Sequence, residues 1–361
     1  MSTTVRHLVE EHPVNFVKET RYMSASSKDW ANKYHPISNL IVRTSVDNNG
    51  ITWADFGGSF LPTLRDDEVR LSLPANRPNR RIWRMDMEAD AAAWFHTEVS
   101  NVVLAGWIEQ PTVLQASEMK ALDENNVKEI VDTTYSIGIK RHERVPMVIG
   151  EFKRGLIDRW GWQGGRLSAV QQNLSRELRG YAYKYSCLQM FCFDGMTLLI
   201  LQFRAVKIDH MRDAKLAVDC WVIPRENEGG TTLRYALYRL LAQGFRRCQG
   251  LSAELAEVGG VLPDRREFFS GVPLWLAKDK KLERRHPYGY YRDVYIGSGR
   301  LYWAYEDKAI TDQQGSWVWD SVGFWEQQVY VDETTDEPAD VPTDEPTGEP
   351  TDEPTDDEIY D

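Results

Sequence analysis

The stretch Val145-Pro-Met-Val-Ile-Gly-Glu-Phe-Lys153 decides which fold this chain can adopt. Its apolar run, residues 147–149, is typical of a strand buried on both faces of a sheet. Side chains alternate along a strand, so Glu151 and Lys153 project from the same face near its end. Two charges there are costly unless they meet a partner, a metal ion or water. The stretch therefore predicts either a strand-end salt bridge or a functional site.

The segment before this strand supplies a second carboxylate. Residues 129–137 alternate as a strand, and Asp132 lies on the face opposite to Val131 and Thr133. Asp is disfavoured in strands, so its presence there is informative. The short connection between the two strands predicts an antiparallel hairpin.

Two helices frame these strands in the sequence. Residues 87–108 have an apolar stripe at helical spacing, with Glu98 beside it as either a solvated flank charge or an acid at the core's edge. Residues 167–185 repeat apolar side chains at steps of three and four, and Glu177 and Tyr181 are neighbours on that helix. Further strands are expected at 189–193, 197–203 and 218–223, the first two joined by a hairpin at Asp194-Gly195.

The order of these segments predicts an α/β protein, more closely an α+β fold with a mixed sheet. Residues 1–75 are expected to form an extension with a weakly periodic helix over 7–22, a hairpin over 40–53 and a solvated loop at 66–68. Residues 76–250 hold the core, and residues 251–330 an aromatic-rich, β-containing extension packed on it. Residues 331–361 repeat Thr-Asp-Glu-Pro, which predicts a disordered acidic tail.

Composition limits the classes of function. The net charge of −12 comes from the tail, because removing its 14 acidic residues leaves 41 acidic against 43 basic residues. A nucleic-acid partner is thus not excluded. The four cysteines have no zinc-ligand spacing and are expected to be reduced core thiols. No signal peptide or apolar span is apparent, so we expect an intracellular protein of the cytoplasm or nucleus that makes no membrane contact.

Asp132 and Glu151, on adjacent strands, suit a hard divalent cation. Mg²⁺ (or Mn²⁺) is usually held by one or two carboxylates and keeps several waters. Such an ion assists hydrolysis of a phosphodiester. Lys153 would orient the attacking water or stabilise the developing negative charge.

At these residues the sequence resembles the PD-(D/E)xK nuclease superfamily, whose fold is called restriction-endonuclease-like. The resemblance covers roughly residues 88–204 and rests mainly on order and spacing. It implies catalytic roles for the helix acid Glu98, the metal ligands Asp132 and Glu151, and Lys153. The exonuclease branch has Gln-x-x-x-Tyr on the next helix, where this chain reads Glu177-Leu-Arg-Gly-Tyr181. Val131 stands where the family usually has Pro. The strand with Gly150-Glu-Phe-Lys153 and the helix with residues 178–185 also resemble segments of uncharacterised proteins of filamentous fungi.

The resemblance implies a nuclease that acts on nucleic acid, with DNA favoured over RNA. The alternative is the same fold kept as an inactive module that binds nucleic acid or protein. A protein kinase is excluded by the lack of a Gly-rich phosphate loop, and a Ser-His hydrolase by the lack of a G-x-S-x-G elbow.

Overall fold

A computed structural model of the chain describes residues 3–20, 22–26, 28–108, 113–120, 129–140 and 143–323. They belong to one compact unit, which runs from Met1 to Gln328. The tail predicted at residues 331–361 lies outside the described residues.

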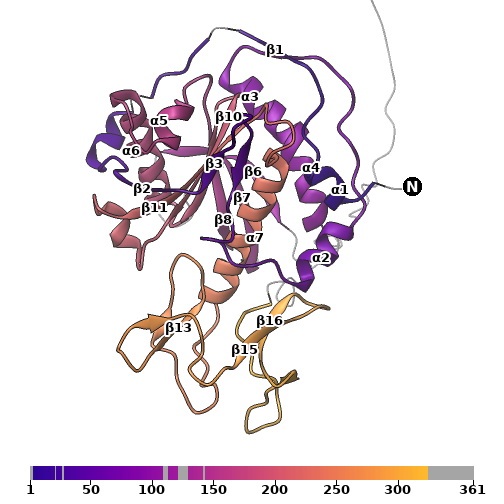
Figure 1. The fold of residues 1–361 in the computed structure, drawn as a ribbon, viewed down its shortest axis with the longest axis vertical. Coiled ribbons are helices and arrows are strands. Elements are labelled where there is room, and N and C mark those ends of the chain that lie inside the picture. Colours follow the sequence, from indigo (N-terminus) through magenta and orange to yellow (C-terminus); the bar gives the residue numbers. More distant parts are fainter. Residues whose placement is uncertain are drawn as a thin grey trace, which may run out of the picture. The chain divides into compact units, whose positions relative to one another are not determined.

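A seven-stranded mixed sheet, in the order β2-β11-β10-β9-β8-β7-β6, forms the centre of this unit (Figure 1). β8 and β9 pair in parallel, as do β2 and β11, and the other four neighbouring pairs are antiparallel. The predicted α/β class with a mixed sheet is confirmed. The strands are β2 (Asn39–Val42), β6 (Leu114–Lys120), β7 (Ile130–Lys140), β8 (Glu143–Phe152), β9 (Gln189–Phe193), β10 (Thr197–Phe203) and β11 (Ala217–Pro224).

Helices cover both faces of the sheet. Helices α5 (Arg159–Gln163) and α6 (Ala169–Lys184) lie on one face, and α3 (Glu88–Phe95), α4 (Asn101–Leu104) and α7 (Leu233–Leu251) on the other (Figure 1). β9 separates two apolar clusters: Met190 and Cys192 belong to the one under α6, while Phe191 and Phe193 belong to the one under α3 and α7. Every residue of β9 is buried, and after Gln189 its sequence is apolar, as expected of a strand covered on both faces.

Most elements of the predicted core are confirmed. The hairpin of β9 and β10 turns at Asp194-Gly195, where Gly195 has φ +90° and Asp194 Oδ1 accepts from the Thr197 amide at 2.8 Å. α6 begins at the predicted cap, Ser168. The predicted helix over 87–108 is α3, a π-helical turn η2 (His96–Ser100), α4 and a 3₁₀ turn η3 (Ala105–Trp107). The predicted thiols Cys187, Cys192, Cys220 and Cys248 are all free and buried.

The N-terminal region departs from the sequence-based expectation. The helix expected over 7–22 is confined to α1 (Val5–Val9), because Pro13 cannot donate to a helical carbonyl, and β1 (Val17–Glu19) pairs in parallel with β5 (Trp83–Met85). The prediction of a solvated loop at 66–68 is wrong. These residues lie in the first turn of α2 (Arg65–Ser72), where acidic side chains suit the helix N-terminus. β2 is an edge strand of the main sheet, so residues 1–75 contribute directly to the core. The remaining elements here are η1 (Asp29–Lys33) and the predicted hairpin, β3 (Thr44–Val46) with β4 (Thr52–Ala54).

The aromatic-rich extension contains β-structure, as predicted. It contains two three-stranded sheets, which follow a 3₁₀ turn η4 (Ile208–Arg212) and α7 in the chain. Arg246 of α7 donates to the Gly299 carbonyl at 2.9 Å, which ties the extension to the core. Among the described residues no helix combines the length and apolar character needed to cross a bilayer. The strands are β12 (Arg265–Arg266), β13 (Pro273–Leu276), β14 (Leu282–Glu283), β15 (Tyr291–Tyr295), β16 (Arg300–Tyr305) and β17 (Lys308–Ala309).

Candidate functional site

Glu151 and Lys153 lie together under α6, at the end of β8. The Lys153 ammonium donates to Glu151 Oε1 at 2.6 Å, as two side chains on one face of a strand can. Both residues are buried, with 1% and 3% of their surface exposed. Parallel pairing continues past β8, since the Lys153 amide donates to the Phe193 carbonyl at 3.0 Å. The backbone that carries the pair is therefore fixed by the sheet.

α6 brings Glu177 and Tyr181 to the same place. Leu174 and Leu178 of this helix pack in the apolar cluster on the sheet, which fixes the helix against β8 and β9. Glu177 is fully buried, and its Oε1 lies 3.2 Å from the Lys153 ammonium. Tyr181 is one helical turn further on. The structure thus joins a strand pair and a helix pair that are 24 or more residues apart in the sequence.

Asp132 reaches the site from β7. The ladder pairs Thr133 with Gly150, and one further step places Asp132 opposite Glu151. Asp132 Oδ2 accepts from the Phe152 amide at 2.6 Å, so the side chain takes over the ladder bond at the strand end. Asp132 is only partly buried, unlike Glu151, and this side of the site reaches solvent.

Two contributors, Ser26 and Lys28, come from the N-terminal segment, and neither was predicted from the sequence. The Lys28 ammonium donates to Glu151 Oε1 at 3.1 Å and to the Tyr181 hydroxyl at 2.7 Å. It also lies 2.7 Å from Glu177 Oε1. The Ser26 hydroxyl donates to Glu177 Oε2 at 2.7 Å. These contacts span more than 120 residues of sequence, and no local pattern around Lys28 signals them.

The site separates the acidities of its two glutamates. Burial raises the pKa of Glu151 to about 8, against the opposing effect of the Lys153 ammonium. Burial would also raise the pKa of Glu177, but Lys153 and then Lys28 lower it to about 2. Burial raises the pKa of Asp132 as well. Burial disfavours the charged forms of Lys28 and Lys153. The neighbouring Glu151 and Glu177 outweigh it and raise the pKa of both amines, which therefore stay charged.

The donor set can be compared with what a divalent cation requires. Glu151 Oε2 is buried and has no hydrogen-bond donor among the described residues. An acceptor left in this way is costly unless a proton or a cation meets it. Asp132 lies beside it on the neighbouring strand. No group of three or more His, Cys, Asp or Glu suited to a metal occurs in the part of the chain that the structure describes. Two carboxylates with waters are nonetheless a common Mg²⁺ donor set, so the residues fit such an ion.

Glu98 lies elsewhere, in the π-helical turn on the opposite face of the sheet. Its Oε1 accepts from the Asn15 side-chain Nδ2 at 2.7 Å and from the Trp83 indole at 2.8 Å. Its backbone carbonyl accepts from Arg234 Nε at 2.7 Å. The structure therefore gathers Asp132, Glu151, Lys153, Glu177 and Tyr181 and leaves Glu98 with other partners. We call Lys28, Asp132, Glu151, Lys153, Glu177 and Tyr181 the carboxylate–lysine cluster.

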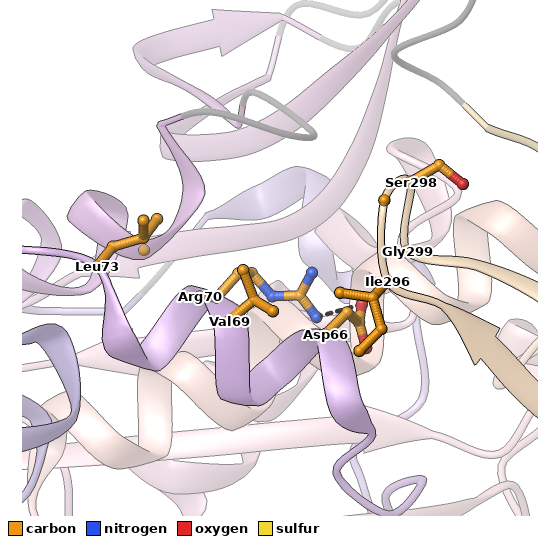
Figure 2. A pocket seen from close by; sticks show the side chains of 9 residues that line it. Asp66, Val69, Arg70, Leu73, Ile296, Ser298 and Gly299 are labelled. Carbon is orange, nitrogen blue, oxygen red and sulfur yellow. Dashed lines mark hydrogen bonds and ion pairs between the residues drawn. The ribbon is translucent and has the colours of Figure 1, made fainter.

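A separate cavity of about 420 Å³ lies between α2 and the turn at residues 296–299. Figure 2 shows Arg70 extending along it toward Asp66, to which Arg70 Nη2 donates at 2.7 Å. No member of the carboxylate–lysine cluster lines this cavity. Asp66 and Arg70, which line it, belong to a different ionic network, together with Asp67 and Arg246.

Comparison with known proteins gives one match. A family model described as a PT disordered repeat matches residues 333–359, within the predicted acidic tail. Neither curated proteins nor solved structures give a match.

Proposed function

We propose that this chain is a metal-dependent nuclease of the PD-(D/E)xK superfamily, with a restriction-endonuclease-like core. The observation that carries the proposal is the convergence of Asp132, Glu151 and Lys153 on one sheet face, beside a buried carboxylate oxygen that has no donor among the described residues. The order of elements supports it. A helix (α3–α4) is followed by three antiparallel strands (β6, β7, β8), the short helix α5, the longer helix α6 and a strand parallel to the third (β9).

Asp132 and Glu151 would hold Mg²⁺ or Mn²⁺. When bound, that ion would supply Lewis-acid polarisation of a phosphodiester and neutralise its charge. Lys153 holds Glu151 through the 2.6 Å bond to Oε1, which leaves Oε2 turned to other partners. Its buried ammonium adds fixed positive charge next to the carboxylates, where the low dielectric makes such charge effective. Nucleic acid, with DNA favoured over RNA, is the partner in this proposal.

The test is cleavage of labelled single- and double-stranded DNA and RNA in Mg²⁺, with EDTA as the blank. Asp132→Asn keeps an oxygen that can accept from the Phe152 amide, so the fold should survive while cleavage falls ~10²-fold or more. Lys153→Met should lower the rate by a comparable factor.

A matched control exists in the chain. Asp279 and Lys281 also form an acid-x-Lys pair, 2.9 Å apart, but both are exposed. Asp279→Asn and Lys281→Met should leave cleavage unchanged. Wild-type protein that is inert toward all four substrates would contradict the nuclease proposal.

The second candidate is an inactive module of the same fold that binds nucleic acid or protein. The contacts of Lys28 favour it, because an ammonium already lies against Glu151 and Glu177. Binding of Mn²⁺ or DNA without cleavage would support this module.

A further inference from the structure

Residues 22–26 and 28, here called the strap, run across the end of β8. The Ser24 amide donates to the Arg154 carbonyl at 2.7 Å, and the Arg154 amide donates to the Ser24 hydroxyl at 2.8 Å. Ser26 then bonds Glu177, as described above. The strap is thus tied first to the residue that follows Lys153 and then to a carboxylate of the cluster. It ends at Lys28.

The Lys28 ammonium has the surroundings of a bound cation. Three oxygens lie around it: Glu151 Oε1 at 3.1 Å, and both Glu177 Oε1 and the Tyr181 hydroxyl at 2.7 Å. An ammonium has three N–H donors and no acceptor. Glu151 Oε1 and the Tyr181 hydroxyl accept hydrogen bonds from it, and Glu177 Oε1 is its ion-pair partner. The Lys28 ammonium is one of two lysine ammonium groups in the cluster.

The two lysines differ in how easily they could leave. Lys153 follows directly on a central strand, and 4% of its side chain is exposed. Lys28 lies in a connection without regular structure, and 38% of its side chain is exposed. The segment after it is anchored independently, since Trp30 of η1 packs on the Tyr181 ring with centroids 5.0 Å apart. Lys28 can therefore turn toward solvent while η1 stays in place.

We propose that the Lys28 ammonium acts as an internal cation that closes the site, and that a divalent metal ion must displace it. The inference rests on the proposed metal site at Asp132 and Glu151. When ionised, the three carboxyl groups of the cluster carry −3, and the two ammonium groups carry +2. A divalent ion added beside both lysines would give +4 against −3. Withdrawal of Lys28 gives +3 against −3, so charge balance favours exchange over addition.

Exchange makes the strap a gate on metal loading. While Lys28 is in place, Glu177 is held by two ammonium groups and the Ser26 hydroxyl. When the Lys28 ammonium leaves, Glu177 keeps only its contacts with Lys153 and Ser26. The strap then loses its contacts with Glu151, Glu177 and Tyr181 at residue 28. The exchange predicts tighter metal binding without the Lys28 charge, and looser strap amides in the metal-loaded wild type.

The test is calorimetric titration of the full chain, freed of metal with EDTA and dialysed, with MnCl₂. Lys28→Met keeps the length of the side chain and removes its charge, so its Mn²⁺ dissociation constant should fall at least tenfold below that of the wild type. Lys33→Met is the matched control, because Lys33 ends η1 and its ammonium lies over the Tyr34 ring instead. Its affinity should equal that of the wild type.

Hydrogen exchange on the wild type needs no variant. Mn²⁺ should speed exchange of the amides of residues 22–26 and 28 several-fold, while the amides of β8 stay protected. Mn²⁺ could bind more tightly to Lys28→Met without any faster exchange of the strap amides in the wild type. Lys28 would then act only through the electrostatic repulsion of its charge, and displacement would be overturned. Equal affinities of Lys28→Met and wild type would overturn the inference alone. Absence of Mn²⁺ binding in every variant would overturn the proposed metal site with it.

Discussion

Two buried ionic networks in this protein have opposite designs. In the first, Arg70 of α2 donates to Asp66 at 2.7 Å and to Asp67 at 3.1 Å, while Arg246 of α7 pairs with Asp66. Tyr238 completes it by donating to Asp67 at 2.6 Å. Two carboxylates thus meet two guanidinium groups. The carboxylate–lysine cluster has three carboxyl groups and two ammonium groups, and one buried oxygen of Glu151 has no donor among the described residues.

This difference indicates what each network is for. Guanidinium groups remain charged and bind carboxylates in fixed planar geometry, which suits a link between α2 and α7. Arg70 is further held by the Trp107 ring, 4.3 Å from its guanidinium carbon. Lysines are compact, mobile and easily perturbed, and a buried carboxyl oxygen without a donor among the described residues, such as Glu151 Oε2, can take up a proton or another cation. The network of two carboxylates and two guanidinium groups is therefore suited to stability, and the cluster, with its donor-free Glu151 oxygen, to the metal binding proposed above.

The largest effect should come from breaking the network of two carboxylates and two guanidinium groups. Arg70→Met leaves two buried carboxylates short of a partner, so the free energy of unfolding should fall by about 3–5 kcal/mol. Lys28→Met, in the other network, should cost less than about 1 kcal/mol, because its side chain is more than one-third exposed and the pair is screened. Urea denaturation of both variants in EDTA gives the two values. Equal losses would mean that the two networks do not differ in the way described.

A pH series should give the next largest effect. The pKa of Glu151 is raised from 4.5 to about 8, so the folded state favours its protonated form. That stabilisation is complete below about pH 4.5, the unfolded value, and is lost as the pH rises through 8. Glu151→Gln cannot ionise, so from pH 5 to 8 it should become more stable relative to the wild type by about 3 kcal/mol in EDTA.

Urea denaturation at several pH values measures this relative change. Asp279→Asn, in an exposed acid-x-Lys pair, should follow the wild-type curve throughout. Parallel curves for Glu151→Gln and the wild type would mean that Glu151 is ionised in the folded protein over the whole range. Ionisation of Glu177 does not change the stability between pH 5 and 8, because its pKa of about 2 confines its contribution to acid pH.

The sequence predicted the part of the molecule in which local pattern and burial agree. Residues 189–193 and 197–203 are apolar and joined by Asp194-Gly195, and they form the hairpin of β9 and β10. The alternation that put Glu151 and Lys153 on one face gave their contact directly. β6 was not predicted, because Leu114-Gln-Ala-Ser-Glu-Met-Lys120 lacks the apolar run of a central strand and lies at the sheet edge.

Other parts of the site depend on contacts that sequence spacing does not contain. No sequence pattern around Lys28 distinguishes it from other lysines of the chain. Only the path of the strap past Arg154 brings it to Glu151. Asp66 and Asp67 looked solvated because their partners Arg246 and Tyr238 are more than 170 residues away. A charged run predicts exposure only when no distant guanidinium group can pair with it.

A small effect is also expected at Glu98, and it tests whether this residue belongs with the stabilising residues. Glu98→Gln keeps an Oε1 that can accept from both Asn15 and Trp83, but these become neutral hydrogen bonds. Since bonds to a charged group are worth somewhat more than neutral ones, the free energy of unfolding should fall by about 1 kcal/mol. Mn²⁺ affinity and any cleavage should equal those of the wild type, because Glu98 contacts Asn15, Trp83 and Arg234 on the other face of the sheet. Calorimetry and the cleavage assay measure these two quantities. A loss of cleavage in Glu98→Gln with unchanged stability would assign Glu98 to the reaction, and would mean that the cluster under α6 is not the whole site.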